Sequence, residues 1–232
     1  MNQNIEHLHF EKCESTQTIL KDELNLRDSI PNLLVSSGSQ SKGRGRSDNK
    51  WDSIENSIAM SFVIEPNSVL TLTSLELGAI ICNYFHDYSL KLKWPNDLLN
   101  SQQMKCAGLL CQTYKDKILV GIGINYGPSQ ILERSQQYKF GRSHITNKQI
   151  NDSDIKIISH SIYSYIINNR LTSEETIETW NSYCTHLNQK VEIRDDKRVD
   201  SGVFKGIGPN GEALIESKDL ITKVYSGSLF LN

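Results

Sequence analysis

The spacing of apolar residues changes near residue 187, and this change limits the folds that the chain can adopt. Up to that point, stretches with helical spacing alternate with short apolar runs typical of buried strands. Beyond it, only short strand-like runs remain, separated by turn residues such as Pro209-Asn210-Gly211. The pattern predicts an α+β fold, in which a mixed β-sheet packed with helices spans 1–187 and a small β-barrel spans 188–232.

The individual elements of the first part follow from the same spacing. We expect strands at residues 8–10, 33–37, 58–64, 104–111 and 118–126. We expect helices after Ser15, over 73–88, around 155–166 and after the capping box that begins at Thr172. The polar segment 126–154 has weak periodicity, which is typical of a functional or disordered loop.

Composition excludes several classes of protein. The 232 residues carry a formal net charge of -2, whereas a dedicated nucleic-acid binder usually has a basic excess. The five cysteines are scattered without a C-x-x-C pair, so we expect reduced thiols and no structural metal site. The first residues are polar, and no apolar run approaches the roughly 20 residues that cross a bilayer. We therefore expect a cytoplasmic protein with no membrane segment.

Two arginines alternate with two glycines in Gly43-Arg44-Gly45-Arg46, just after a strand-like run. Arginine offers a planar fork of donors that matches carboxylate and phosphate. Glycine lets the backbone bend tightly and lets a ligand come close. The stretch is typical of a loop that holds a small anion, but an exposed basic loop that touches nucleic acid fits it equally well.

Two further stretches offer polar groups near strand ends. The run Lys93-Trp94-Pro95-Asn96-Asp97 presents an amide and a carboxylate after a proline, although it also has the composition of a plain turn. Lys105 begins an apolar strand-like run, where a lysine is costly to bury without an anionic partner. A bound carboxylate or phosphate is one such partner, and an edge strand that lets the lysine reach water is the alternative.

The stretch Gly121-Ile122-Gly123-Ile124-Asn125 alternates glycine with isoleucine. In a strand, both glycines and Asn125 then lie on one face, opposite the two isoleucines. Two missing side chains make a floor for a flat group, with an amide at its end. Glycine in a strand marks the close approach of a ligand or, alternatively, of a packed helix.

Taken in order, these stretches resemble the motifs of the biotin protein ligases. The matching residues are Gly43-Arg44-Gly45-Arg46 followed by Trp51, Lys93-Trp94-Pro95-Asn96-Asp97, Lys105-Cys106-Ala107-Gly108-Leu109-Leu110 and Gly121-Ile122-Gly123-Ile124-Asn125. Ser15-Thr16-Gln17 is similar to the family's Ser-Thr-Asn. The resemblance covers nearly the whole chain, since the C-terminal strands are similar to the family's SH3-like domain.

The resemblance implies a two-step, ATP-dependent reaction assisted by Mg²⁺. Biotin and ATP form biotinyl-5'-AMP, and biotin then passes to a lysine of the biotin carboxyl carrier domain of acetyl-CoA carboxylase. The implied catalytic residues are Lys105, Arg46 and Asp97. The implied biotin-binding residues are Ser15, Thr16, Gln17, Gln40, Arg44, Gly45, Arg46, Lys105 and Gly108. The implied ATP- or adenylate-binding residues are Arg44, Arg46, Trp51, Asn96, Lys105, Gly123 and Asn125.

The chemistry of these steps fits the residue types. Basic side chains neutralise a carboxylate and a phosphate that repel each other. Asp97 is the candidate for helping to deprotonate the acceptor lysine, whose free pKa of about 10.4 makes it a poor nucleophile at neutral pH.

The sequence departs from the family pattern in several places. Ser47-Asp48-Asn49-Lys50 follows the glycine-arginine run, where further Arg and Gly are common in the family. Ser53-Ile54-Glu55-Asn56-Ser57 replaces the usual Ser-Pro-x-Gly-Asn, which predicts a different turn. The family's adenine-covering loop has no clear match, and Tyr138 and Phe140 are the candidates. Only 14 residues precede Ser15, so we expect no helix-turn-helix and no operator binding. A monomer and a ligand-promoted homodimer both fit.

Three alternatives remain to be compared with this hypothesis. A lipoate–protein ligase has the same fold, but the glycine-arginine run and Lys93–Asp97 favour biotin. A ligase with a covalent lysyl-nucleotide needs Lys-x-Asp-Gly, whereas Ala107 precedes Gly108 here. A nucleic-acid-binding module is disfavoured by the acidic balance, and its affinity would fall steeply with salt.

Overall fold

The computed structural model describes residues 5–46, 49–129, 141–195 and 198–231. The chain divides into two compact units, each made of two segments. The first unit contains Met1–Pro66 and Met104–Asn169, and the second contains Asn67–Gln103 and Arg170–Asn232. Among the residues that the structure describes, none of the helices is long and apolar enough to cross a membrane.

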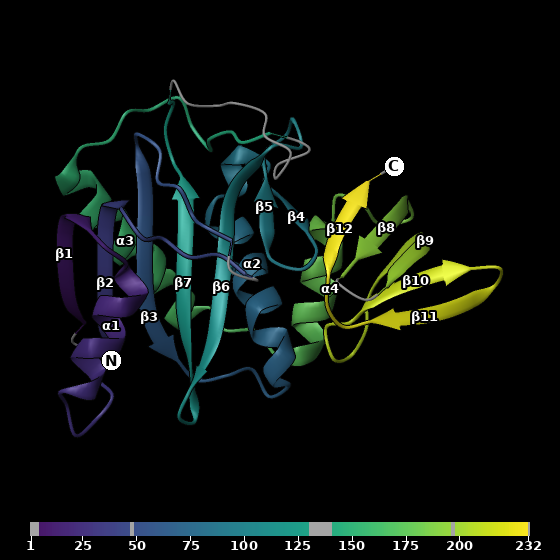
Figure 1. The fold of residues 1–232 in the computed structure, drawn as a ribbon, viewed down its shortest axis with the longest axis horizontal. Coiled ribbons are helices and arrows are strands. Elements are labelled where there is room, and N and C mark those ends of the chain that lie inside the picture. Colours follow the sequence, from purple (N-terminus) through teal and green to yellow (C-terminus); the bar gives the residue numbers. More distant parts are fainter. Residues whose placement is uncertain (1–4, 47–48, 130–140, 196–197, 232) are drawn as a thin grey trace. The chain divides into compact units, whose positions relative to one another are not determined.

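The first unit is built on a mixed sheet. Its strands are hydrogen-bonded in the order β1 (Glu6–Cys13), β2 (Leu33–Gln40), β3 (Ser57–Ile64), β7 (Lys117–Asn125) and β6 (Lys105–Tyr114). β1 runs parallel to β2, and the other neighbours are antiparallel. Helices α1 (Thr16–Asn25) and α3 (Asp152–Asn168) cover opposite faces of this sheet (Figure 1). The predicted mixed α+β fold is confirmed.

Local sequence explains where the helices begin and what they bury. The Ser15 hydroxyl accepts a hydrogen bond from the backbone of Thr18 and caps α1, as predicted. Asn151 and Asp154 form a capping box at the start of α3. Under α1, one core cluster consists of Leu20, Leu24, Leu33, Val35, Val63, Tyr114 and Leu119. On the other face, the rings of Phe62 and Tyr163 lie 4.8 Å apart.

The second unit contains helices, a short hairpin and an antiparallel sheet. Its first segment holds η1 (Leu70–Leu72), α2 (Thr73–Tyr84), η2 (His86–Tyr88), β4 (Lys91–Lys93) and β5 (Asp97–Leu99). The helix predicted over 73–88 is therefore interrupted after Tyr84, and Ser89 has the left-handed φ of 51°.

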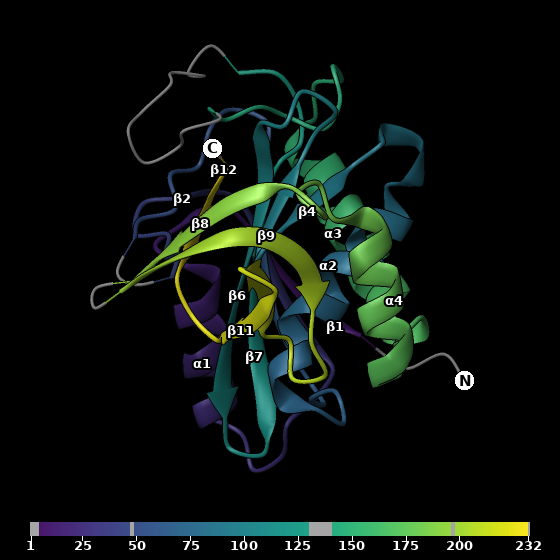
Figure 2. The ribbon, with the colours of Figure 1, turned by 90° about the vertical axis from the view of Figure 1, so that its right-hand side faces the viewer.

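The later segment of this unit begins with α4 (Ser173–Tyr183), which has the predicted capping box of Thr172 and Glu175. Five strands follow in the order β11 (Leu220–Val224), β10 (Ala213–Ser217), β9 (Val199–Ile207), β8 (Lys190–Arg194) and β12 (Ser228–Leu231). Figure 2 shows β8 and β9 side by side. The predicted run of C-terminal strands is confirmed, whereas β12 was not predicted. Closure of these strands into a barrel stays a prediction, as does a boundary at residues 187 and 188.

Candidate active site

One face of the first unit's sheet carries small residues next to the N-terminal end of α1. Gly123 of β7 lies between Ala59 of β3 and Gly108 of β6 in the antiparallel register. Gly121 lies between Ser61 and Leu110 in the next row on that face. The alternation predicted for this strand is confirmed, and it makes a floor of small residues, which we call the glycine floor.

A flat group does lie on the glycine floor, and it is the indole of Trp51. A Cβ added to Gly123 would overlap the atoms of this ring. A Cβ added to Gly108 would lie 3.5 Å from the same ring and 3.3 Å from Lys105 Nζ. Lys105 Nζ lies 5.8 Å from the centre of the Trp51 ring, within range of a cation–π interaction. The floor, the indole and the lysine therefore form one group.

Two buried polar atoms at this place have no hydrogen-bond partner in the described part of the chain. They are the donor Trp51 Nε1 and the acceptor Asn125 Oδ1. The other side-chain atom of Asn125 donates to the Ser143 carbonyl at 3.0 Å. A buried polar group without a partner costs about 1–3 kcal/mol. A ligand that supplies an acceptor and a donor here would remove that cost.

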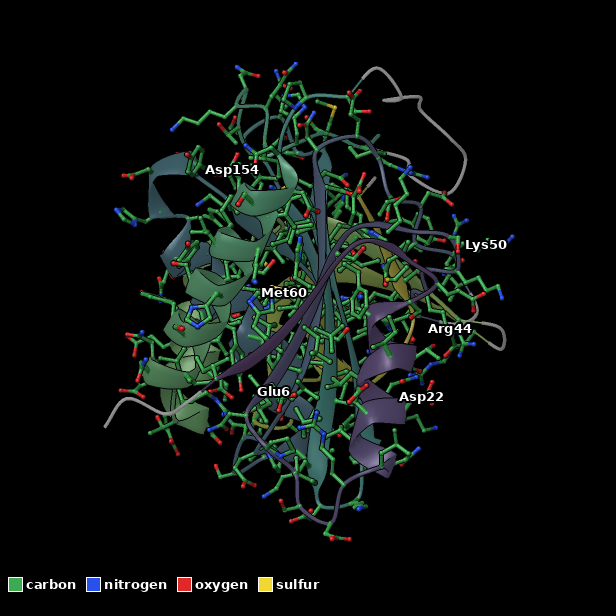
Figure 3. The ribbon with its side chains drawn as sticks, turned by 90° about the vertical axis from the view of Figure 1, so that its left-hand side faces the viewer. Glu6, Asp22, Arg44, Lys50, Met60 and Asp154 are labelled. Atoms are coloured by element: carbon green, nitrogen blue, oxygen red, sulfur yellow. The ribbon has the colours of Figure 1, made fainter. Side chains whose placement is uncertain are left out.

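The glycine-arginine stretch forms a narrow loop that leads back to Trp51. The Trp51 N–H donates to the Gly43 carbonyl at 3.0 Å, and Arg44 pairs with Lys50 across the loop. A Cβ at Gly43 would overlap the Trp51 backbone, so this position requires glycine. Figure 3 shows the side chains of Arg44 and Lys50 on the side of the sheet that carries α1. Ser47 and Asp48 lie outside the described residues.

Polar side chains meet where α1 begins and β2 ends. Gln40 Oε1 accepts hydrogen bonds from the backbone of Thr16 at 2.8 Å and from its hydroxyl at 3.2 Å. The Thr16 hydroxyl also contacts the Ser61 hydroxyl at 2.8 Å. Gln17 donates to the Leu110 carbonyl at 3.2 Å, and its amide lies over Gly121. Four residues predicted to bind biotin, including the helix cap Ser15, therefore border the small residues of the sheet.

The segment 141–146 pairs with Lys105 and Asn125. Lys105 donates its N–H to the Gly141 carbonyl at 3.1 Å and accepts from the Ser143 N–H at 2.9 Å. Ile145 donates to the Asn125 carbonyl at 3.0 Å. Sequence reasoning did not find Arg142 or Ser143, because backbone pairing of a loop leaves no periodic pattern. The candidates Tyr138 and Phe140 lie outside the described residues.

Asn56 forms the turn at the place where the family usually has Ser-Pro-x-Gly-Asn. Its φ is 58°, in the left-handed region that asparagine adopts more readily than most residues. Its side chain donates to the Pro128 carbonyl at 2.8 Å and accepts from the Ile150 N–H at 3.0 Å. Asn56 thus joins the two ends of the segment 128–150.

The other predicted site residues are placed as follows. Arg46 is partly buried in the glycine-arginine loop and accepts the Asn49 N–H at 3.0 Å through its carbonyl. Asn96 and Asp97 belong to the second unit, where the Trp94–Pro95 peptide is cis and Asp97 Oδ2 lies 3.8 Å from Lys93 Nζ. A role for Asn96 and Asp97 in the site stays a prediction. In the described residues, no cluster of three His, Cys, Asp or Glu side chains is arranged for a metal ion.

Comparison with known proteins identifies the class. Residues 9–129 match the model of the biotin/lipoate A/B protein ligase family, and the chain belongs to that family. The biotin protein ligase of Aquifex aeolicus, solved with biotin and ATP, superposes with a TM-score of 0.78 and 26% identity over 98% of this chain and 99% of that chain.

Curated relatives agree with this assignment. The bifunctional ligase/repressor BirA of Bacillus subtilis is 24% identical over 97% of this chain and 74% of its own length. The biotin–protein ligase 2 of Arabidopsis thaliana is 34% identical over 39% of this chain and 32% of its own. The resemblance found in the sequence motifs is confirmed.

Proposed function

We propose that this chain is a biotin–protein ligase that forms biotinyl-5'-AMP from biotin and ATP and transfers biotin to a carrier-domain lysine. The observation that carries the proposal is the glycine floor with Lys105 beside it and two buried polar atoms, Trp51 Nε1 and Asn125 Oδ1, that have no hydrogen-bond partner among the described residues. Family membership and the likeness to a ligase solved with biotin and ATP support it.

In the first step, a carboxylate oxygen of biotin attacks the α-phosphorus of ATP. The bond from this phosphorus to the β-phosphate oxygen breaks, and pyrophosphate leaves. Both reactants are anions, so the step needs positive charge at the meeting point. Lys105 supplies this charge from beside the glycine floor, and Arg44 and Arg46 supply it from the glycine-arginine loop. Mg²⁺ would neutralise further charge on the triphosphate, since it binds through phosphates and waters more than through protein cages.

In the second step, the amine of the acceptor lysine attacks the acyl carbon of biotinyl-5'-AMP, and AMP leaves. The amine must lose a proton, and Asp97 is the proposed acceptor of that proton. We propose the biotin carboxyl carrier domain of acetyl-CoA carboxylase as the source of the lysine.

The polar border of the site favours biotin over lipoate. The hydroxyl and amide groups of Ser15, Thr16, Gln17 and Gln40 suit the ureido ring of biotin, which both donates and accepts hydrogen bonds. The dithiolane ring of lipoate has no such donor. A site with buried polar groups discriminates strongly against a similar ligand that leaves those groups without hydrogen bonds.

Incubation with ATP, Mg²⁺, labelled biotin and a purified carrier domain tests the proposal. We expect label on the carrier lysine, and we expect excess lipoate to leave the yield unchanged. A carrier with its lysine replaced by arginine is the matched control and should stay unlabelled. Labelling by lipoate in place of biotin would reassign the chain to the lipoate branch of the family.

A further inference from the structure

Arg142 lies next to Lys105 and has no part in the reaction described above. The two residues pair in a parallel bridge, closed by the Lys105 N–H to Gly141 and the Ser143 N–H to Lys105. Both side chains reach the same short segment. Lys105 Nζ lies 5.8 Å from the centre of the Trp51 ring, and Arg142 Nη2 lies 2.8 Å from a carboxylate oxygen of Asp52. Two positively charged side chains therefore approach the neighbouring residues Trp51 and Asp52.

The ion pair between Arg142 and Asp52 is uneven in its exposure to solvent. The Arg142 side chain is 17% exposed, whereas that of Asp52 is 58% exposed. An ion pair with one partner in water contributes little to stability. The mostly buried Arg142 side chain nevertheless needs an anion beside its charge. Asp52 can therefore be exchanged for a stronger anion at small cost.

Phosphate is the anion that this pair of cations fits best. The guanidinium fork matches two phosphate oxygens at once, and an ammonium group binds as a compact point charge. Two neighbouring positive charges attract a multiply charged anion more strongly than a single carboxylate. Adjacent Lys105 and Arg142 therefore match a ligand that carries several negative charges.

We propose that Arg142 binds the phosphates of ATP and that Asp52 is the counter-ion that it releases when the nucleotide binds. This inference rests on the proposed function, because it names a further residue for the nucleotide of that reaction. Asp52 then competes with ATP for Arg142. The two partners of this ion pair therefore have opposite effects on the affinity for ATP.

The variants R142Q and D52N test the inference, because each breaks the same ion pair. We expect R142Q to raise the KM for ATP about 10- to 100-fold, as expected for the loss of hydrogen bonds to a charged group. We expect D52N to lower the KM for ATP. R142K keeps the positive charge, so we expect it to raise the KM for ATP less than R142Q does. The KM for biotin should not change in any of them. R27Q, which breaks the distant Arg27–Glu6 pair, is the control and should leave both constants unchanged.

Each other outcome would overturn the inference. Equal changes in KM for ATP in R142Q and D52N would mean a purely structural ion pair. A higher KM for biotin alone would mean that Arg142 serves the carboxylate. If the wild type forms no biotinyl-5'-AMP, the proposed function fails, and titration calorimetry of ATP with the same variants still measures the predicted loss. A wild type that binds no ATP would contradict both proposals.

Discussion

At the scale of single residues, the site depends on the absence of a side chain at Gly123. The indole of Trp51 occupies the space above it, and an added Cβ would overlap that ring. We expect Gly123→Ala to displace Trp51, to abolish adenylate formation and to lower the free energy of unfolding by about 1–3 kcal/mol, the usual cost of overpacking.

Gly108→Ala is the matched comparison for this prediction. Its Cβ would meet the flexible end of Lys105 at 3.3 Å, so we expect a smaller loss. Tryptophan fluorescence reports the displacement of Trp51, and urea unfolding measures the loss of stability in both variants. Equal losses in the two variants would contradict the role given to the glycine floor.

Lys105 is the residue on which the charge argument for the first step depends. We expect Lys105→Ala to slow single-turnover formation of biotinyl-5'-AMP by about 10²–10³, because a preorganised charge at the phosphorus is lost. Lys156→Ala, at an exposed position on α3, is the control. An unchanged adenylation rate in Lys105→Ala would remove this lysine from the mechanism.

At the scale of secondary-structure elements, the periodicity of apolar residues predicted the helices and strands that bury one clear face. The glycine alternation of β7, the cap of α1 and the capping box of α4 were all visible in the sequence, whereas the capping box of α3 was not predicted. A strand end at Lys93 was expected, and β4 ends there. The strand β5 was not predicted, since three residues are too few to show a period. The segment that pairs with Lys105 and Asn125 was not found either, because its hydrogen bonds join distant positions without regular spacing.

A histidine cluster ties β1 to β2 and α3. His7 Nε2 and His9 Nδ1 each lie 2.7 Å from the Ser36 hydroxyl, and His9 Nε2 lies 3.0 Å from Asp152. The rings of His7 and His160 stack at 6.0 Å. Burial, followed by the nearby charges of His9, His160 and Lys156, lowers the pKa of His7 to about 4.

This depressed pKa makes the packing of β1 sensitive to acid. Between about pH 6.5 and 4 the unfolded chain binds a proton at His7 that the folded chain does not, so stability falls as pH falls through this window. The variant His7→Gln stays neutral. Between pH 7.5 and 5, we expect its free energy of unfolding to fall by about 1 kcal/mol less than that of the wild type, after discounting for partial exposure. Urea unfolding at the two pH values measures this difference. Equal losses in both proteins would mean that His7 is not the group responsible.

At the scale of the whole molecule, contacts between distant parts of the chain decide how each unit is assembled. The second unit joins residues 67–103 to 170–232. Its link is Glu76, which is 0% exposed and 2.6 Å from Arg170 Nε. Glu76 also accepts hydrogen bonds from the Leu171 N–H and the Asn67 amide. The two residues are 94 positions apart, and no local pattern in the sequence reveals such a contact between distant segments.

Removing one partner of this buried pair leaves the other without a counter-charge. We expect Glu76→Ala to lower the free energy of unfolding by about 3–5 kcal/mol. Arg170→Ala should also destabilise, and the double variant should lose less than the sum of the single losses, because the two residues act as a unit. In a Trp51→Phe background the remaining tryptophans, Trp94 and Trp180, both belong to the second unit, so their fluorescence reports its unfolding in urea. Additive losses would show that Glu76 and Arg170 are not coupled and that other contacts join the two segments.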